Sequence, residues 1–383
     1  MDRCDALVVG GGPAGSTCAA WLRQAGLDVL VMDRARFPRE KPCAGWITPQ
    51  AVAAAALDLD EYGARHVLQP IRGLRTCQAG GPAANVDYGE VVSWGVRRCE
   101  FDDYLLRRSG ARVRHEAVLR LGRVGDDLVV NESIRARLVV GAGGQFCPVA
   151  RALGATRCGQ PLVAAQEVEG RMSARDEQRC PVASERPELY FCSDLEGYGW
   201  IFRKGSILNV GFGRRDARSF PARAHAFWGF LRAAGRVPAA FAPPWSGHAY
   251  RLYERTAPRL LDDGVLLVGD AAGLAYAQSG EGIAPAIESG RLAAAAVAAA
   301  SGRFTRERLS SYENALVSRF GRPASQSTAA LVPQALRAPL AGLALAVPFL
   351  SRRLVLDPVF LHRRKPPLTD PAPYLAAPTL GYA

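Results

Sequence analysis

Lysine is nearly absent from this chain: among its 383 residues, only Lys41, Lys204 and Lys365 carry that side chain. The formal net charge is still +12, because arginine supplies almost all of the positive charge. No basic segment is long or interleaved with aromatic residues, so the sequence argues against a nucleic-acid partner. Since the chain is also rich in alanine, we attribute the charge to overall composition rather than to a polyanionic ligand.

Closely spaced metal ligands are missing as well. The nine cysteines form no C-x-x-C pair and no Cys/His cluster, so we expect no metal site. No apolar run reaches the ~20 uncharged residues of a membrane-spanning helix, and no charged segment followed by an apolar one indicates a signal peptide. An odd number of cysteines in a chain that opens on a predicted core strand fits a reducing compartment. We therefore expect a cytoplasmic protein.

What the chain does have is a glycine-rich turn between its first apolar run and its first helical segment. Gly10 permits a tight turn, Gly12 lets the backbone approach a phosphate, and Gly15 lets the helix pack close to the strand. The helix N-terminus points free N–H groups and a partial positive charge at the anion. The expected phosphate-binding residues are Gly10, Gly12, Pro13, Ala14 and Gly15.

An acidic residue follows the second apolar strand. Asp33 stands about 20 residues past the glycines, where a carboxylate is placed to bind a ribose hydroxyl, and Arg34 comes next in the chain. Together with the glycine turn, this spacing predicts a dinucleotide site.

A second strand-to-helix junction lies far along the chain, where a short apolar run meets Gly269 and Asp270. Asp270 is placed to accept hydrogen bonds from ribitol hydroxyls. The next helix begins near Gly280, Gly282 and Ile283, and its N-terminus would face the negative edge of a reduced isoalloxazine. Two junctions of this kind, with strands inserted between them, favour FAD over a nicotinamide cofactor.

The element pattern predicts an α/β protein, α+β overall, in which a Rossmann-type FAD-binding domain carries an inserted, mostly antiparallel β-sheet domain. The expected pieces are residues 1–70, 98–160 and 256–300 for the FAD-binding domain, 71–97 and 161–255 for the substrate-binding domain, and 301–383 for a helical C-terminal region. The C-terminal region either packs on the body as a helix pair or forms an interfacial surface that touches membrane.

In combination these motifs resemble the flavoprotein superfamily of aromatic hydroxylases and, within it, the geranylgeranyl reductase family. The resemblance spans about residues 5–300. It rests on the first turn, on a lysine, cysteine and glycine stretch beside the flavin, on an arginine that contacts the cofactor, and on the GDAAG and GEGI segments. The matching residues are Gly10 to Gly15 with Asp33, Lys41 with Cys43, Ala44 and Gly45, Arg98 with Phe101 and Asp102, and Gly269 to Ile283.

The resemblance implies an enzyme of lipid biosynthesis in which reduced flavin saturates double bonds of an isoprenoid, polyprenyl or other apolar substrate. Tyr198, Trp200 and Phe202 look like part of the family signature that lines the substrate cavity, although by themselves they also fit an ordinary buried strand face. Cys43 would lie near the flavin and help protonate a substrate carbon. A cysteine considered without its motif is commonly buried and inert.

Three positions depart from the family pattern. Leu195 and Arg203 replace two prolines of the aromatic signature, so the ends of the cavity are expected to differ. Gly143, which we count among the cofactor-binding residues, stands where the superfamily usually has an aspartate tied to both FAD and NAD(P)H. The electron donor is therefore either NAD(P)H or a separate electron-donor protein.

Two other functions fit the same fold. An FAD-dependent monooxygenase or halogenase would act on a small aromatic or apolar metabolite, and a halogenase would need Lys41 or Lys204 in its site. A non-catalytic flavin-binding scaffold is less compatible with two intact junctions. The expected partners are a small apolar substrate, with a peripheral membrane contact as a further candidate.

Overall fold

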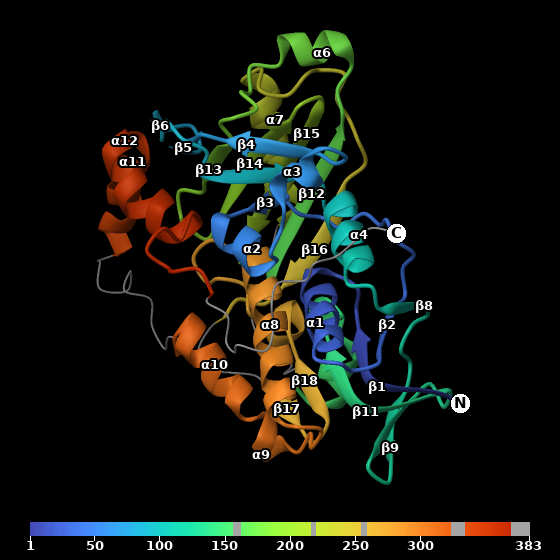
Figure 1. Ribbon diagram of the computed structural model, residues 1–383. Coiled ribbons are helices and arrows are strands. Elements are labelled where there is room, and N and C mark those ends of the chain that lie inside the picture. Colours follow the sequence, from blue (N-terminus) through green and yellow to red (C-terminus); the bar gives the residue numbers. More distant parts are fainter. Residues whose placement is uncertain (156–161, 216–219, 254–258, 323–333, 369–383) are drawn as a thin grey trace.

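The computed structural model describes residues 1–155, 162–215, 220–253, 259–322 and 334–368. A Rossmann-type unit fills the lower half of Figure 1, and a second large β-sheet rises above it. The expected domain boundaries near residues 160 and 256 lie outside the described residues. The same holds for positions 323–333 and 369–383 of the expected C-terminal region.

The first sheet has eight strands, and its main path runs β17-β18-β11-β1-β2-β8. Neighbours from β18 to β8 are parallel, whereas β9 and β10 form an antiparallel hairpin beside β11. The strands are β1 (Asp2–Val9), β2 (Val29–Asp33), β8 (Arg112–His115), β9 (Leu121–Val124), β10 (Asp127–Val130), β11 (Ile134–Gly141), β17 (Leu261–Asp262) and β18 (Val265–Leu267).

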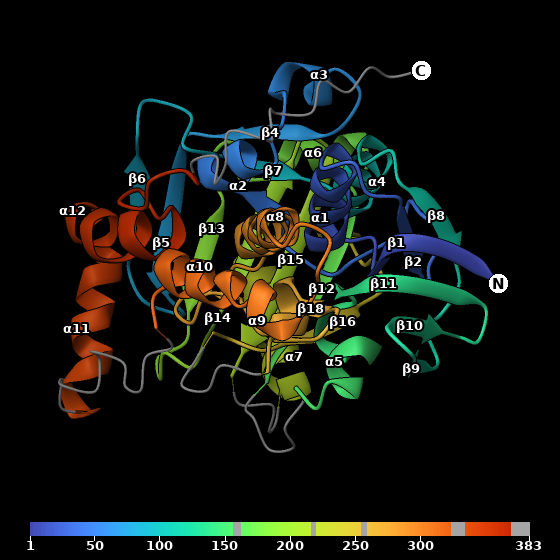
Figure 2. The same cartoon turned by 60° about the horizontal axis from the view of Figure 1, so that its bottom comes forward.

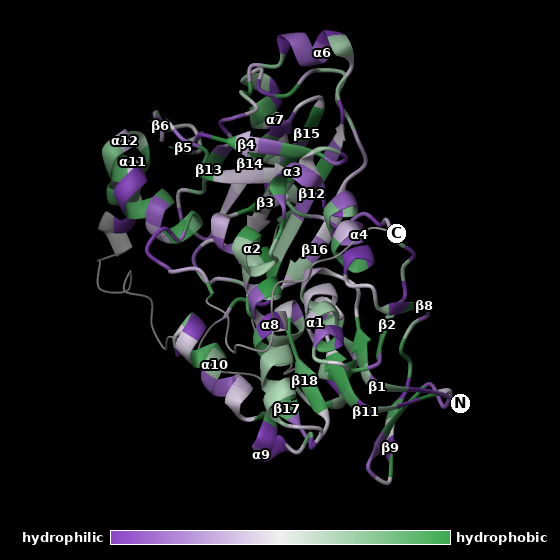
Figure 3. Cartoon of the chain, in the orientation of Figure 1, coloured by the Kyte–Doolittle hydropathy of each residue, from purple (hydrophilic) through white to green (hydrophobic). Residues whose placement is uncertain are grey.

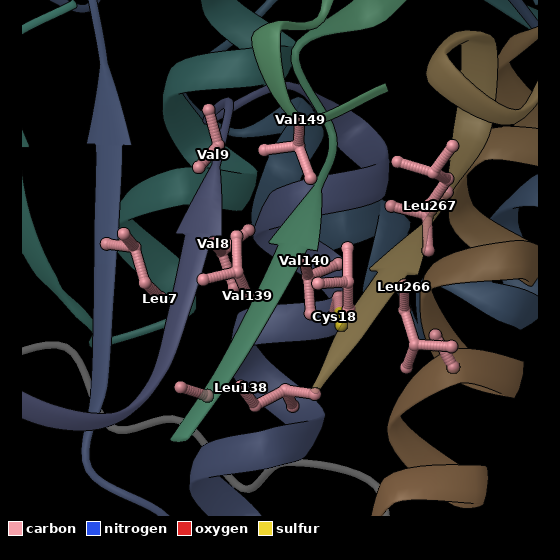
Figure 4. Close-up of a cluster of buried hydrophobic side chains, with 14 of the residues drawn as sticks. Leu7, Val8, Val9, Cys18, Leu138, Val139, Val140, Val149, Leu266 and Leu267 are labelled. Carbon is pink, nitrogen blue, oxygen red and sulfur yellow. The ribbon is translucent and has the colours of Figure 1, made fainter. Parts of the chain in front are cut away.

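The central strands of this sheet are apolar along their whole length. Leu7 and Val8 of β1 and Val139 of β11 are completely buried, and they pack with Leu266 of β18 in the core shown in Figure 4. Parallel strands covered on both faces require such continuous apolar runs rather than alternation. Figure 3 shows the same strands as the hydrophobic centre of the lower half of the molecule.

Two helices cover one face of the first sheet. α1 (Pro13–Gln24) and α8 (Ile283–Ala299) lie side by side, as Figure 2 shows. They can approach because glycines stand at the contacts: a Cβ at Gly290 would lie 2.5 Å from the carbonyl oxygen of Ala14. A Cβ at Gly15 would lie 1.9 Å from the carbonyl oxygen of Gly10, whose φ of +113° is rare for residues with side chains. The first turn is thus held directly against α8.

The second sheet has seven strands in the order β16-β12-β15-β14-β13-β5-β6. All neighbours are antiparallel except β13 and β5. The strands are β5 (Gly73–Gln78), β6 (Ala83–Asp87), β12 (Val163–Arg171), β13 (Glu188–Phe191), β14 (Gly197–Lys204), β15 (Ile207–Arg214) and β16 (Ser246–Tyr250).

The two faces of the second sheet have different partners. Ile201 of β14 packs in a core with Phe212 and with Phe227 of α7 (Phe220–Ala233). Its neighbours Trp200 and Phe202 belong to another cluster on the opposite face, because side chains alternate along a strand. That opposite face is turned toward the expected cofactor site.

Short elements connect the two large sheets. β3 (Trp46–Ile47), β7 (Ser93–Val96) and β4 (Leu68–Ile71) form a three-stranded antiparallel sheet. Other elements of the described chain are α2 (Pro49–Ala54), α3 (Leu59–Gly63), α4 (Arg98–Arg108), α5 (Pro148–Ala152), α6 (Ala174–Arg179), α9 (Arg306–Leu309), α10 (Ser311–Phe320) and the 3-10 turns η1 (Gly144–Phe146) and η2 (Gly269–Ala272).

The last helical part of the C-terminal region packs on the second sheet, whereas α9 and α10 lie against α8. It consists of α11 (Gln334–Ala346), α12 (Pro348–Leu350) and the π-helical segment η4 (Ser351–Phe360). The Thr76 hydroxyl of β5 donates to the carbonyl of Leu345 at 2.9 Å. Within the described residues no single helix has the length and hydropathy to cross a membrane. Residues Arg337–Ala346 and Pro348–Phe360 pass that test only as a pair bent by 103°.

The expected fold class is confirmed: a Rossmann-type unit, a mostly antiparallel second sheet and a helical C-terminal region are all present in the described residues. The sheet pairing shows how the inserted strands return to the first unit. β18 follows the second sheet in sequence and pairs in parallel with β11, so it brings the second junction beside the first.

The contact between α1 and α8 predicts the effect of one methyl group. Gly290→Ala should lower the free energy of unfolding by about 1–3 kcal/mol, because the helices must separate to admit the Cβ. Urea unfolding followed by circular dichroism measures this. Gly229→Ala in α7 is the matched control: nothing lies within 4 Å of its Cβ position, so alanine should be neutral or stabilise by up to about 1 kcal/mol. Equal stability of the two variants would contradict the packing argument.

Candidate functional site

A cavity of about 900 Å³ runs from the first glycine turn to the face of the second sheet that carries Trp200 and Phe202. Most of the residues expected from the sequence line it, although they come from segments far apart in the chain. Those residues are Gly10, Gly12, Pro13, Ala14, Asp33, Arg34, Lys41, Cys43, Ala44, Arg98, Gly143, Tyr198, Trp200, Phe202, Asp270, Gly280, Gly282 and Ile283.

Three expected cofactor residues do not line the cavity but shape the backbone around it. Gly15 packs against Gly10, as described above. Gly45 has a φ of +67°, and a Cβ there would lie 2.0 Å from the carbonyl oxygen of Val96. The Gly269 N–H donates to the Ser289 hydroxyl of α8 at 2.9 Å. These glycines therefore set the course of the chain at the site.

The end of the cavity at the first turn is suited to an anion. Gly12 precedes α1, whose first-turn N–H groups have no side-chain cap, and Gly12, Pro13 and Ala14 all line the cavity. The Arg39 guanidinium lies 3.4 Å from the Cβ position of Gly12 and adds a full positive charge to the partial charge of the helix N-terminus. A pyrophosphate would find N–H donors and a cation here.

Asp33 stands beside the turn with a fixed orientation. Its carboxylate accepts hydrogen bonds from the backbone N–H groups of Gly11 at 2.8 Å and Ala35 at 2.9 Å. A carboxylate held in this way at the end of the second strand is placed for a ribose hydroxyl. The arrangement agrees with the spacing argument made from the sequence.

Lys41, His248 and Asp270 form a charged group in the middle of the cavity. The Lys41 Nζ lies 2.8 Å from the His248 Nε2, which is 3.5 Å from an oxygen of Asp270. Burial, together with the nearby arginines, lowers the pKa of Lys41 to about 8 in spite of the favourable charge of Asp270. Burial and the charge of Lys41 also lower the pKa of His248. Burial alone would raise the pKa of Asp270, but His248 and Lys41 lower it on balance.

Arg98 begins α4 and is buried beneath the cavity. Its Nε and Nη2 each donate to a different oxygen of Asp102 at 2.8 Å, and Arg39 reaches the same carboxylate at 3.2 Å. Burial opposes the charge of Arg98, yet the ion pair with Asp102 raises its pKa overall. Asp102 therefore holds two cations in position below the cofactor cavity.

The opposite end of the cavity is aromatic. Tyr198, Trp200 and Phe202 come from one face of β14, and each lines the cavity. Trp200 donates from Nε1 to Asn209 at 2.8 Å, and a Cβ at the facing Gly211 would lie 2.1 Å from its ring. These three residues thus share one strand face and also line the cavity, and their role toward a substrate stays a prediction.

Phe360 of η4 closes the aromatic wall from the C-terminal region. Its ring stacks on Trp46 with centroids 5.7 Å apart and meets Tyr198 edge-on at 5.5 Å. Sequence reasoning missed this residue, because the family resemblance stopped before the C-terminal region. It also missed His248, which only the pairing of β16 with β12 brings to Lys41. The alternation of His248 and Tyr250 on one strand was the available signal.

Cys43 lies in the loop before β3 and lines the cavity. Its thiol accepts a hydrogen bond from the Gly45 N–H at 3.4 Å, and its carbonyl accepts one from Asn209 at 3.2 Å. Lys204, in contrast, is buried outside the cavity lining. It donates to Glu169 and to the carbonyl of Val96, each at 2.8 Å. A halogenase would need one of these two lysines in its site, and of the two only Lys41 lines the cavity.

The donor set of the cavity fits FAD. One end offers a helix N-terminus, Arg39 and Asp33 for the pyrophosphate and ribose, and Asp270 follows as an acceptor for hydroxyl groups. The second junction reaches the cavity through Gly280 and Gly282. Polar groups lie at the first turn and aromatic groups at the far end, as a cofactor with one charged end and an apolar partner would require.

Comparisons with known proteins agree with this assignment. Residues 8–66 match the family model of the NAD(P)-binding Rossmann-like domain. The chain is 34% identical to a menaquinone reductase of Mycobacterium tuberculosis, with 76% of each chain covered. It is 30% identical to the chloroplastic geranylgeranyl diphosphate reductase of Oryza sativa, with 79% of this chain and 68% of that protein covered.

Solved structures show the same fold. A geranylgeranyl bacteriochlorophyll reductase-like protein from Thermoplasma acidophilum superposes with a TM-score of 0.72 at 22% identity, covering 90% of this chain and 88% of the other. A point mutant of the halogenase PltM in complex with FAD gives a TM-score of 0.65 at 20% identity, with 82% of this chain and 74% of that chain covered. At this level of identity the likeness concerns the fold alone.

The contact between Lys41 and His248 predicts a change that nuclear magnetic resonance can detect. Lys41→Met should raise the pKa of His248, because it removes a cation that disfavours the protonated imidazole. The chain has five histidines, so the imidazole resonances of the apoprotein can be assigned by substitution. Lys365→Met is the matched control, since Lys365 lies by Tyr276 and Glu288. An unchanged His248 titration in Lys41→Met would contradict the contact.

Proposed function

We propose that this chain, which belongs to the geranylgeranyl reductase family of FAD-dependent oxidoreductases, reduces carbon–carbon double bonds of a polyprenyl or other apolar substrate. The observation that supports this most strongly is the aromatic wall of Trp46, Tyr198, Trp200, Phe202 and Phe360, which continues directly from the cofactor end of one cavity. Such a wall suits an apolar chain and excludes water from the reacting carbons.

The residues of the chain divide the work between binding and chemistry. The first turn, Arg39 and Asp33 hold the adenosine and pyrophosphate end, and Asp270 accepts hydrogen bonds from the ribitol. When bound, FAD supplies a hydride to an alkene carbon. The aromatic wall orients the double bond, and an acid on the cavity wall must supply a proton to the other carbon. Cys43 is the candidate acid that the sequence motif suggests.

The residue at position 143 bears on the electron donor. Gly143 lines the cavity and carries no carboxylate to bind a pyridine nucleotide. We therefore propose that a reduced electron-carrier protein is at least as suitable a donor as NAD(P)H. The transfer of hydride from the reduced flavin to the substrate does not depend on the donor. It can be tested with protein that has been reduced chemically.

An oxygen-free experiment tests the reaction type. The FAD-loaded protein, reduced with dithionite and mixed with geranylgeranyl diphosphate, should give a product heavier by two hydrogen atoms while the flavin reoxidises. Mass spectrometry and flavin absorbance measure the two events, and oxidised protein in the same mixture is the control. A strict requirement for oxygen, with a product heavier by one oxygen atom, would instead support the monooxygenase alternative.

We further propose that the C-terminal region rests on a lipid surface from which the apolar substrate enters. Leu340, Leu343, Phe349 and Leu354 are each more than half exposed on α11, α12 and η4. Arg353, exposed and lying over the Phe349 ring, would complement anionic headgroups. The segment that carries these side chains also supplies Phe360 to the cavity wall, so membrane contact and substrate entry would involve one element.

Vesicle sedimentation tests the membrane contact. The double variant Phe349→Asp and Leu354→Asp should bind vesicles containing phosphatidylglycerol about tenfold or more weakly, since two large apolar side chains would no longer enter the lipid. Val124→Asp on β9, where the valine is 55% exposed, is the matched control and should bind normally. Equal binding of both variants would contradict a lipid contact at the C-terminal region.

A further inference from the structure

β12 carries a buried glutamate, Glu167, and a partly buried one, Glu169, that share one partner. Glu167 and Glu169 are two residues apart, so their side chains lie on the same face of the strand. The Asn209 amide of β15 is 3.2 Å from an oxygen of Glu167 and 3.1 Å from an oxygen of Glu169. Asn209 also donates to the carbonyl of Cys43. Asn209 therefore connects both glutamates to the Cys43 loop.

The two glutamates differ in their other neighbours. Glu169 accepts from Lys204 at 2.8 Å and from Arg97 at 3.3 Å. Across the described ranges of the chain, no lysine or arginine nitrogen forms an ion pair within 4.0 Å of Glu167. Glu167 is only 5% exposed, yet it lines the cavity, whereas Glu169 does not. The carboxylate of Glu169 is thus held in ion pairs, whereas the carboxyl of Glu167 faces the cavity without a paired cation among the described residues.

These surroundings separate the acidities of the two groups. Burial raises the pKa of Glu167 to about 7, although the Cys43 backbone, Lys204 and Asn209 favour its charged form and Glu169 opposes it. Burial alone would raise the pKa of Glu169 too, but the ion pair with Lys204 lowers it on balance. Two carboxyl groups whose pKa values are driven apart in this way are typical of sites with a dedicated acid.

We propose that Glu167 is the proton donor for the double-bond reduction, an inference that rests on the proposed function above. Its carboxyl lines the same cavity as the aromatic wall of Tyr198, Trp200 and Phe202. Asn209 joins this wall to the carboxyl, because it accepts from Trp200 and donates to Glu167. Orientation of the substrate and orientation of the acid are thereby fixed by one side chain.

The step balances with the reduced flavin as the only co-reactant. The π bond of the alkene breaks; one carbon forms a C–H bond with the proton of Glu167, and the other forms a C–H bond with a hydride from the reduced flavin. The flavin is oxidised by two electrons and the alkene is reduced by two. The Glu167 carboxylate then regains its proton from water when the product leaves.

The activity test compares three substitutions in the FAD-loaded, chemically reduced protein. Glu167→Gln should lower the rate of product formation about 100-fold or more, because the amide cannot donate a proton of comparable acidity. Glu167→Asp should restore part of the rate. Glu185→Gln, at an exposed glutamate, is the matched control and should keep the wild-type rate. The wild-type rate should fall above about pH 7, as Glu167 ionises.

A stability test reads the same carboxyl without any reaction. The folded protein holds the Glu167 proton to a higher pH than the unfolded chain does, so wild-type stability should decrease between about pH 5 and pH 8. Glu167→Gln removes this dependence. The urea midpoint of the wild type, relative to that of Glu167→Gln, should therefore fall steadily as the pH rises across that range. Parallel plots of midpoint against pH for the two proteins would overturn the proposal.

The outcomes separate this inference from the proposed function. Full activity of Glu167→Gln in a protein whose wild type reduces the substrate would overturn the assignment of Glu167 alone. That assignment is also overturned if Cys43→Ala abolishes the decline above pH 7 while Glu167→Gln retains it, because the thiol would then be the acid. A wild-type protein that reduces no polyprenyl compound would reject the proposed function, and the assignment of Glu167 with it.

Discussion

The site depends on how closely α1 approaches α8. The first turn and the second junction are more than 250 residues apart in sequence, yet FAD must contact both. The backbone of Ala14 and the Cβ position of Gly290 would clash at 2.5 Å, and the Cβ position of Gly269 lies 2.9 Å from the Cβ of Ala14. Only glycine leaves enough room at these positions. The absence of side chains there is what brings the two halves of the cofactor site together.

Charged side chains line the resulting cavity in the order that FAD would require. Arg39 and the α1 N-terminus supply positive potential at the first turn, and Asp102 holds Arg39 and Arg98 in place from below. Further along, His248 lies 3.5 Å from the carboxylate of Asp270, whose charge also acts on Lys41, and the charge of Lys41 helps burial to lower the pKa of His248. Beyond them the wall becomes aromatic. The gradient from cations to aromatic rings orients a molecule with a charged end before any specific contact is made.

The sequence predicts those parts of the site that depend on local backbone geometry. Gly10, Asp33 and Asp270 belong to short motifs in which neighbouring residues create the binding geometry, so spacing suffices to find them. Glu167 and Phe360 could not be found in this way. Each acquires its place through strand register or through packing of the C-terminal region, and neither has a motif of its own. Glu167 also looks identical to Glu169 until Lys204 is seen to pair with only one of them.

The position of η4 bears on how the proposed substrate would enter the cavity. Phe360 packs on Trp46 and Tyr198, so the C-terminal region forms part of the cavity wall at this end. Docking is maintained by polar contacts, among them the Thr76 hydroxyl with the carbonyl of Leu345 and Tyr88 with Asp357. If the cavity of about 900 Å³ holds both FAD and the proposed polyprenyl substrate, a long chain would leave part of its length outside. The exposed apolar side chains of α11, α12 and η4 lie on the element next to that wall, where such a chain would still need an apolar environment.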